Sequence, residues 1–125
     1  AIEVRLMDGL DIRVFDEDAL YVICSSTYGA GDVPDNARHL YESLASEPRY
    51  LGSVRYGVIA LGDSVYPQTF CNGGLRFDER LADLGAVRIG DVFRHDASAG
   101  TEAEVVGAAW CRQWLTHALQ TSEPV

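Results

Sequence analysis

The amino-acid sequence predicts an α/β domain with a doubly wound parallel sheet. Continuous apolar runs alternate along the chain with amphipathic helical patterns, which is the signature of a parallel sheet covered by helices. Three runs are rich in β-branched and aromatic residues, as strands buried on both faces are: residues 20–24, 56–61 and 87–93. A length of 125 residues suits one core. We therefore expect a single domain over residues 1–125.

Helical patterns follow each of these runs, over about residues 34–45, 75–84 and 101–119. Pro34 suits the first turn of the first helix, and Gly85 is expected to cap the end of the second. Thr101 and Glu104 form a capping-box pattern before the third helix. Four of its residues recur at every fourth position and predict packing against the core rather than a cofactor site: Val106, Trp110, Trp114 and Ala118.

The N-terminal part of the chain is less regular. Residues 2–7 alternate apolar and polar side chains and predict a half-buried strand. Residues 8–18 are polar and turn-like, with little periodicity, so we expect a connection there rather than a helix or strand.

Charge and cysteine content exclude several classes of protein. A formal net charge of -9 at pH 7 would repel nucleic acids and anionic membranes, but it suits a basic protein partner as well as simple solubility. The three cysteines are widely separated without a CxxC pair, which argues against a disulfide framework and a zinc site. No apolar run is long enough to span a membrane. We expect a cytoplasmic protein with reduced thiols.

Two glycine-containing loops follow the first two apolar runs, over residues 26–32 and 61–72. Ligands of open parallel sheets bind beyond the carboxyl ends of the strands, and neighbouring strands would bring these loops face to face. Each loop contributes a tyrosine, so Tyr28 and Tyr66 could clamp a flat aromatic ligand. The alternative is that the rings only cover the loop ends. A dinucleotide fingerprint starting at Gly29 is disfavoured, because Pro34 occupies its third glycine position.

These loops resemble those of the flavodoxin-like family of FMN proteins, in particular small flavodoxins of the MioC type and the FMN domains of sulfite reductase and cytochrome P450 reductase. Ser-Ser-Thr-Tyr-Gly-Ala-Gly-Asp at 25–32 is similar to the loop after the family's third strand. Leu-Gly-Asp-Ser-Val-Tyr at 61–66, with Phe-Cys at 70–71, is similar to the loop after its fourth. The likeness continues through 77–86 and 88–91. It implies the strand order 2-1-3-4-5, an FMN cofactor and one-electron transfer without a nucleophile or general base.

The resemblance also assigns roles at the FMN site. Tyr28 would lie against one face of the isoalloxazine and Tyr66 against the other, while the Gly29 carbonyl would accept a hydrogen bond from N5 of the reduced flavin. Ser26 and Thr27 would line the ribityl chain and the ring edge. The complete set of implied cofactor-binding residues is Ser26, Thr27, Tyr28, Gly29, Ala30, Gly31, Leu61, Gly62, Asp63, Tyr66, Phe70, Cys71, Asn72 and Asp96.

Several of these roles are specific to the second loop and the last strand. Cys71 and Asn72 would close the second loop, and Asp96 could reach the polar edge of the ring. Asp63 could face the flavin or could instead hold the turn of its own loop. Carboxylates such as Asp32 and Asp63 near the ring would disfavour added negative charge and so lower the reduction potential.

The sequence departs from the family pattern in two places. The family begins with a strand and a hydroxyl-rich phosphate loop, Thr/Ser-x-Thr-Gly-x-Thr/Ser, which residues 1–125 do not contain, and residues 2–7 match its second strand instead. We therefore expect the native chain to include a further strand–loop–helix segment of about 30 residues before Ala1. Three residues separate Tyr66 from Phe70, where relatives usually have two.

The leading hypothesis is an FMN-binding electron-transfer flavodoxin whose redox partner is a basic-surfaced reductase or acceptor. Two alternatives stay open: the FMN domain of a multidomain diflavin reductase, and a flavin-free binding domain that keeps only the fold. The histidines are scattered through the sequence, so no catalytic or metal-binding role is assigned to His39, His95 or His117.

Overall fold

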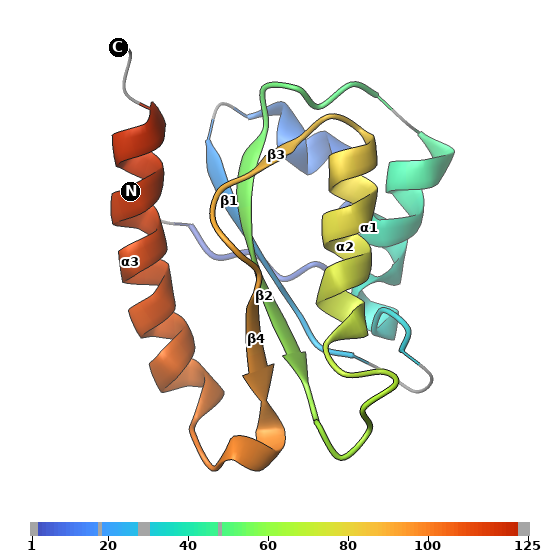
Figure 1. Cartoon of the computed structure of the whole chain (residues 1–125). Helices are drawn as coiled ribbons and strands as arrows, with labels where there is room; N and C mark the ends of the chain where they lie inside the picture. Colours follow the sequence, from blue (N-terminus) through green and yellow to red (C-terminus); the bar gives the residue numbers. More distant parts are fainter. Residues whose placement is uncertain (1–2, 18, 28–30, 48, 123–125) are drawn as a thin grey trace.

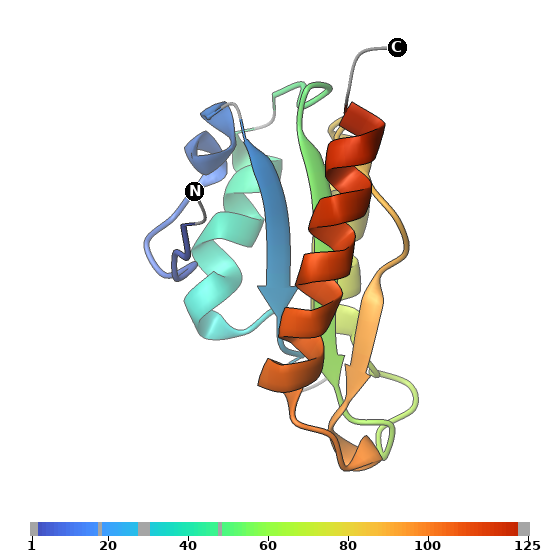
Figure 2. The same ribbon diagram turned by 90° about the vertical axis from the view of Figure 1, so that its left-hand side faces the viewer.

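The computed structural model describes residues 3–17, 19–27, 31–47 and 49–122 of the chain. Within these residues, four parallel strands form the sheet: β1 (Leu20–Ser25), β2 (Arg55–Gly62), β3 (Val87–Arg88) and β4 (Phe93–Asp96). β1 pairs along one edge of β2, while β3 and β4 pair in succession along its other edge. Two helices, α1 (Asp35–Ser46) and α2 (Asn72–Asp83), cover one face, and α3 (Ala103–Ser122) covers the other (Figure 1 and Figure 2). The predicted α/β fold is confirmed.

The face of the sheet under α1 and α2 holds most of the buried apolar side chains. The inner residues of β2 pack there against one side of each helix, and all of these side chains are almost fully buried: Tyr56, Val58, Leu40, Leu44, Phe77 and Leu81. The Tyr56 hydroxyl donates to Asp78 Oδ1 at 2.7 Å, and Arg88 Nη1 donates to Asp78 Oδ2 at 2.6 Å. These bonds join β2, α2 and β3 near the amino ends of the strands.

The opposite face of β2 accepts α3 at a glycine. A Cβ at Gly57 would overlap the Trp114 indole, so the helix approaches here because the side chain is missing. Trp110 lies stacked between Phe93 and Trp114, with ring centroids 5.9 Å and 6.1 Å away. Trp114 is buried, and its Nε1 donates to Ile89 O at 2.9 Å. The predicted packing role of the tryptophan stripe is confirmed.

The predicted third strand, over residues 87–93, is interrupted and extends further than predicted. β3 ends at Arg88, Gly90 adopts a φ of 73°, and the strand resumes as β4 up to Asp96. The Ile89 N–H still bonds β2, at 2.8 Å, but the Ile89 carbonyl accepts from Trp114 instead of the ladder. The left-handed conformation of Gly90 and the hydrogen bond from Trp114 to the Ile89 carbonyl therefore interrupt the strand. Neither feature can be predicted from the apolar residues of the run.

The predicted strand over residues 2–7 is wrong. Residues 3–7 form no regular structure, and residue 2 lies outside the described residues. Val4 and Leu6 are 89% and 82% exposed, so the apolar positions of the alternating pattern bury little surface. Alternation produces a strand only where a neighbouring strand pairs with it and one face is buried, and residues 3–7 pair with none of the described strands.

The next segment, predicted to be a connection, contributes to the core. Its 3-10 helix η1 (Ile12–Asp16) begins at Asp11, whose carboxylate accepts from Arg13 N at 3.0 Å. Ile12 and Phe15 are buried, and Ile12 N donates to Ser43 Oγ of α1 at 2.9 Å. The apolar residues of residues 8–18, namely Leu10, Ile12, Val14 and Phe15, span too short a stretch to show a helical period.

The helix ends partly agree with prediction. Gly85 caps α2 as expected, with a φ of 94°. Ala86 N bonds Leu81 O at 3.1 Å and Gly85 N bonds Ala82 O at 3.0 Å, which is the Schellman arrangement. α1 agrees with its predicted bounds within one residue, whereas α2 begins at Asn72, three residues earlier than predicted.

The predicted capping box of the last helix is wrong. α3 begins at Ala103, and the amides of Val105 and Val106 both bond Glu102 O at 3.1 Å. Thr101 lies before this turn, and its Oγ1 is 3.1 Å from His95 Nε2 of β4.

No helix in the described part of the chain has the length and apolar content needed to cross a membrane.

Candidate functional site

The carboxyl ends of β1 and β2 open into a cavity of about 520 Å³. The two predicted loops both contribute to it, at the lower end of the sheet in Figure 1. Six of the predicted site residues line it: Ser26, Thr27, Leu61, Gly62, Asp63 and Tyr66. The parallel pairing of β1 with β2 brings the loops together, as the sequence predicts.

Thr27 connects the two loops and the start of α2. Its Oγ1 donates to Leu61 O at 3.0 Å and accepts from Gly73 N at 3.0 Å. The hydroxyl therefore satisfies a carbonyl near the end of β2 and one of the free N–H groups of a helix start. The residue still borders the cavity, but its polar side-chain atom holds the loops in place.

Close backbone contacts reinforce this junction. A Cβ at Gly73 would overlap the carbonyl oxygen of Ser26, so α2 can begin against the first loop only because this residue is glycine. Gly31 has a φ of 97°, and a Cβ there would lie 3.0 Å from Asn72 Nδ2. Asn72 thus lies against the end of the first loop, while its Nδ2 donates to Gln68 O at 3.3 Å.

The second loop is a series of hydrogen-bonded turns. Asp63 Oδ1 accepts from Val65 N at 2.9 Å, and Asp63 O accepts from Tyr66 N at 3.0 Å. Tyr66 O in turn accepts from Thr69 N at 3.1 Å. The turn-holding role considered for Asp63 is therefore confirmed. Tyr66 borders the cavity with 65% of its surface exposed, so its ring is available for contact with a ligand.

Asp96, at the end of β4, joins the second loop to the short helix η2 (Ala97–Ala99). Its Oδ1 accepts from Ser64 N at 3.0 Å, from Ser98 N at 3.0 Å and from Ser98 Oγ at 2.7 Å. The hydroxyl oxygens of Ser64 and Ser98 are 2.8 Å apart. The hydrogen bonds from Ser64 and then Ser98 hold the pKa of Asp96 far below its usual range.

Phe70 and Cys71 lie beneath the second loop rather than at the cavity. Phe70 packs on the core, and Cys71 is fully buried, with Sγ 3.3 Å from Ala60 O. Burial raises the pKa of the Cys71 thiol. Cys71 also has a φ of 60°, a left-handed conformation that redirects the chain into α2. These residues shape the loop from below.

The remaining predicted residues of the first loop, Tyr28, Gly29 and Ala30, lie outside the described residues. Their roles stay predictions. Two residues border the cavity without a predicted role: Ala97, directly after Asp96, and Thr69, within the second loop. Gly73 also had no predicted role, and its position directly after the second loop was the available signal.

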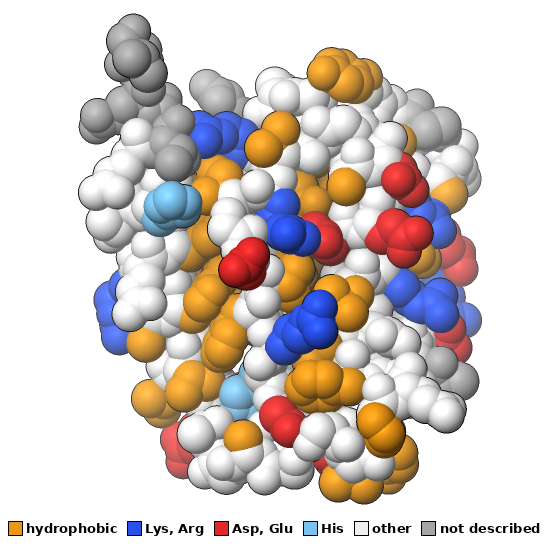
Figure 3. Space-filling view, viewed as in Figure 1, with side chains coloured by type: hydrophobic (Ala, Val, Ile, Leu, Met, Phe, Trp, Pro, Cys, Tyr) orange, Lys and Arg blue, Asp and Glu red, His pale blue; other side chains and the backbone are white. Residues whose placement is uncertain are grey.

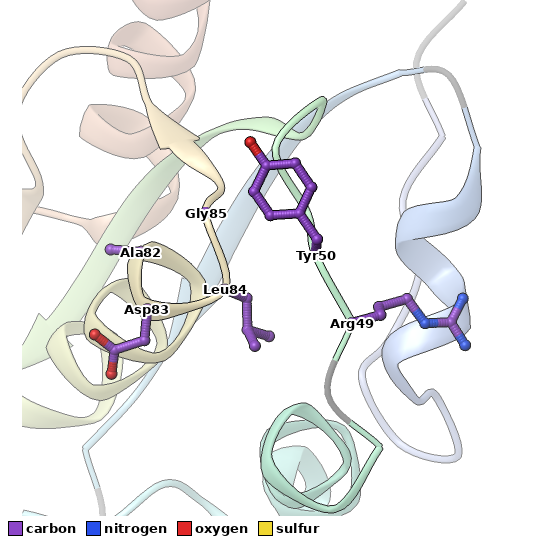
Figure 4. Close-up of a pocket in the computed structure, with 6 residues that line it drawn as sticks. All are labelled: Arg49, Tyr50, Ala82, Asp83, Leu84 and Gly85. Atoms are coloured by element: carbon purple, nitrogen blue, oxygen red, sulfur yellow. The ribbon is translucent and has the colours of Figure 1, made fainter.

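A second cavity, of about 410 Å³, lies at the amino end of the sheet (Figure 4). The Tyr50 ring lies against Gly85, where a Cβ would meet it at 2.5 Å, beside the end of α2. No predicted site residue borders this cavity. Ligands of parallel sheets bind at the carboxyl ends of the strands, so the cavity at the tyrosine loop is the candidate site.

Comparison with known proteins agrees with the fold. The flavodoxin family model matches residues 1–110. Flavodoxin YqcA of Pectobacterium carotovorum subsp. carotovorum is 40% identical over 116 residues, covering 85% of this chain and 76% of that protein. The sulfite reductase [NADPH] flavoprotein alpha-component of Vibrio cholerae is 39% identical over 119 residues, 92% of this chain but 18% of that protein. A solved structure of a mutant of flavodoxin from Pseudomonas aeruginosa superposes with a TM-score of 0.75 at 29% identity, covering 85% of this chain and 70% of that one. The chain belongs to the flavodoxin family.

Proposed function

We propose that the chain binds FMN at the cavity between its two loops and carries single electrons between redox proteins. The observation that carries the proposal is the exposed Tyr66 ring on a hydrogen-bonded loop, facing a second loop across the carboxyl ends of β1 and β2. The cavity volume of about 520 Å³ lies within the range of ligand pockets, roughly 300–1,000 Å³. The residues present therefore fit the isoalloxazine.

FMN, when bound, supplies the one-electron redox chemistry. The chain itself orients the ring and sets the charge around it. Tyr66 offers an aromatic face for stacking, and the turns of the second loop fix the position of that face. The carboxylates of Asp63 and Asp96 oppose additional negative charge at the ring and so favour a low reduction potential. Asp32 contributes less, because Arg76 Nη2 lies 3.8 Å from its carboxylate.

Titration with FMN tests the proposal. We expect quenching of flavin fluorescence on binding, a yellow preparation and a reversible absorbance change on anaerobic reduction. Y66A should weaken FMN binding about 10-fold or more through the loss of stacking and burial, while Y66F, which keeps the ring, should stay within about 2-fold. A protein that binds no FMN would contradict the proposal and favour the flavin-free alternative.

We also propose that a further strand–loop–helix segment completes the phosphate end of the site, alongside β1. No described residue pairs with the outer edge of β1, and Val22 on that strand is 37% exposed despite its position within the apolar run. A phosphate loop there would make FMN bind far more tightly than riboflavin. The test needs protein whose intact mass exceeds 13.7 kDa. Equal affinities of that protein for FMN and riboflavin would contradict a phosphate loop beside β1.

The second candidate context is a multidomain reductase. The similarity to the sulfite reductase flavoprotein component covers 92% of this chain and only 18% of that protein, as expected where one domain matches. The length of the native gene decides between this context and a small flavodoxin. In either context, the net charge of -9 favours a basic-surfaced redox partner.

A further inference from the structure

We propose that Asp96 is a positioning residue for the proposed flavin site, which places the Tyr66 ring by fixing the tip of the second loop to the end of β4. The inference rests on the proposed function for its consequence, but the contact itself exists without a ligand. The resemblance implied that Asp96 could reach the polar edge of the flavin ring, whereas its hydrogen bonds hold the second loop and η2.

The second loop depends on this contact for its placement. Its other hydrogen bonds, such as Asp63 Oδ1 to Val65 N, lie within the loop and give it a shape. Within the described residues, every hydrogen bond from residues 63–69 to the protein outside the loop runs through Ser64, to Asp96 Oδ1 at 3.0 Å and Ser98 Oγ at 2.8 Å. Ser64 is two residues from Tyr66, so the position of this bond decides where the ring lies.

Asp96 Oδ1 accepts three hydrogen bonds, which is more than a helix cap requires. A cap of η2 needs only the bond from Ser98 N, which is 3.0 Å long. The same Oδ1 also receives Ser64 N, from a residue 32 positions earlier in the chain, and Ser98 Oγ at 2.7 Å. These donors come from two separate segments, so a single ionised oxygen holds them against each other. Charge-assisted bonds of this kind are stronger than bonds between neutral groups.

Ala97 provides the link from this clamp to the cavity. It follows Asp96 directly and borders the same cavity as the loop that contains Tyr66. The carboxylate therefore fixes two walls of the cavity at once, the Tyr66 loop and the start of η2. Loss of the clamp would leave Thr27 and Cys71 holding the two ends of the loop, while its tip lost its attachment to the sheet.

The test compares D96N with D91N in the full chain. Both remove one negative charge, but Asp91 is exposed and makes no hydrogen bond or ion pair with the described residues, so D91N controls for charge alone. In flavin-free protein, D96N should speed amide exchange at Ser64 and Tyr66 about 10-fold or more, with little change at Gly73. Unchanged exchange at Ser64 would overturn the proposal whether or not the protein binds FMN.

Binding of riboflavin and FMN then tests the action through Tyr66. D96N should weaken both ligands by the same factor, about 5-fold, because the clamp does not touch the phosphate. In a Y66A background the same substitution should have less than about 2-fold effect. An equally large effect of D96N with and without Tyr66 would mean that the carboxylate acts on the ring directly, and would overturn the positioning role. Failure of the wild-type chain to bind either flavin would instead overturn the proposed function and leave the exchange result to decide the clamp.

Discussion

Thr27 Oγ1 joins two loops and a helix with two hydrogen bonds, to Leu61 O and from Gly73 N. The resemblance of the first loop to that of flavodoxins implies that Thr27 lines the ribityl chain and the ring edge. In the folded protein the Thr27 hydroxyl instead makes both of these hydrogen bonds to other parts of the chain. Asp63 and Asp96 behave in the same way, each accepting backbone N–H groups of the loops. Rigidity of the site therefore comes from side chains that would otherwise be counted as ligand contacts.

Replacement of Thr27 by valine should measure this contribution. T27V keeps the shape of the side chain but leaves Gly73 N–H and Leu61 O without their partner, so we expect a loss of about 1–3 kcal/mol in the free energy of unfolding. T27S keeps the hydroxyl and should cost less than about 1 kcal/mol. Urea unfolding followed by circular dichroism gives both values. Equal stability of T27V and the wild type would show that water replaces both bonds.

Asp11 at the start of η1 gives a pH dependence. Hydrogen bonds from the Arg13 side chain and backbone lower the pKa of Asp11 to about 2. A carboxyl whose pKa is lower in the folded state contributes stability above its unfolded pKa, about 3.9, and loses that contribution as the pH falls towards 2. D11N should therefore lower Tm at pH 7, with the difference from wild type shrinking between about pH 4 and pH 2. D8N, at the exposed Asp8 outside η1, removes the same charge without touching Arg13 and serves as the control.

At the scale of helices and strands, the apolar runs make β1 and β2 visible in the sequence, and each strand agrees with its run within one residue. β2 is buried on both faces, as strands covered by helices are, whereas Val22 and Cys24 of β1 are exposed. The start of α2 is different. Gly73 and Gly74 count against a helix by propensity, so the sequence predicts a later start. Their contacts with Ser26 and Ala60 override that preference, and these contacts exist only in the folded sheet.

Two glycine-to-alanine substitutions separate these effects. A Cβ at Gly73 overlaps backbone atoms of the first loop, so G73A should destabilise the protein by about 1–3 kcal/mol and weaken flavin binding. A Cβ at Gly107 in α3 would lie 3.9 Å from Ile59 Cδ1, an ordinary contact, so G107A should stabilise by about 0.5–1 kcal/mol through its helix preference. Unfolding in urea and FMN titration compare them. A stabilising G73A would contradict the close approach of the first loop and α2.

At the scale of the whole molecule, the two cavities lie at opposite ends of one sheet, and only the carboxyl end gathers the predicted loops. The general rule for parallel sheets makes that end predictable from sequence. The bond between Ser64 and Asp96 is not predictable, because it depends on how β4 continues after the break at Gly90. The alternating segment at residues 3–7 fails for a related reason, since its pattern carries no information about which edge is available.

Surface charge extends over the whole molecule and affects encounters with partners. Acidic and basic side chains intermix on the face shown in Figure 3, although the chain as a whole has a net charge of -9. Electron transfer from the reduced protein to a basic haem protein should therefore slow about 10-fold between about 20 and 500 mM salt, because screening removes electrostatic steering. Stopped-flow absorbance measures the rate. Reaction with an uncharged quinone controls for salt effects on the protein itself, and a salt-independent rate with the basic acceptor would contradict the proposed preference for a basic-surfaced partner.

Both tryptophans of the chain belong to α3, where their indoles stack on each other and rest over Gly57. Intrinsic tryptophan fluorescence therefore reports one event, the separation of α3 from the sheet, and is blind to the loops at the carboxyl end. The paired indoles should also produce an exciton couplet in the far-ultraviolet circular dichroism spectrum. Tryptophan unfolding curves of this protein thus record the face of the sheet under α3, and tyrosine or flavin signals are needed to observe the loops at the carboxyl end.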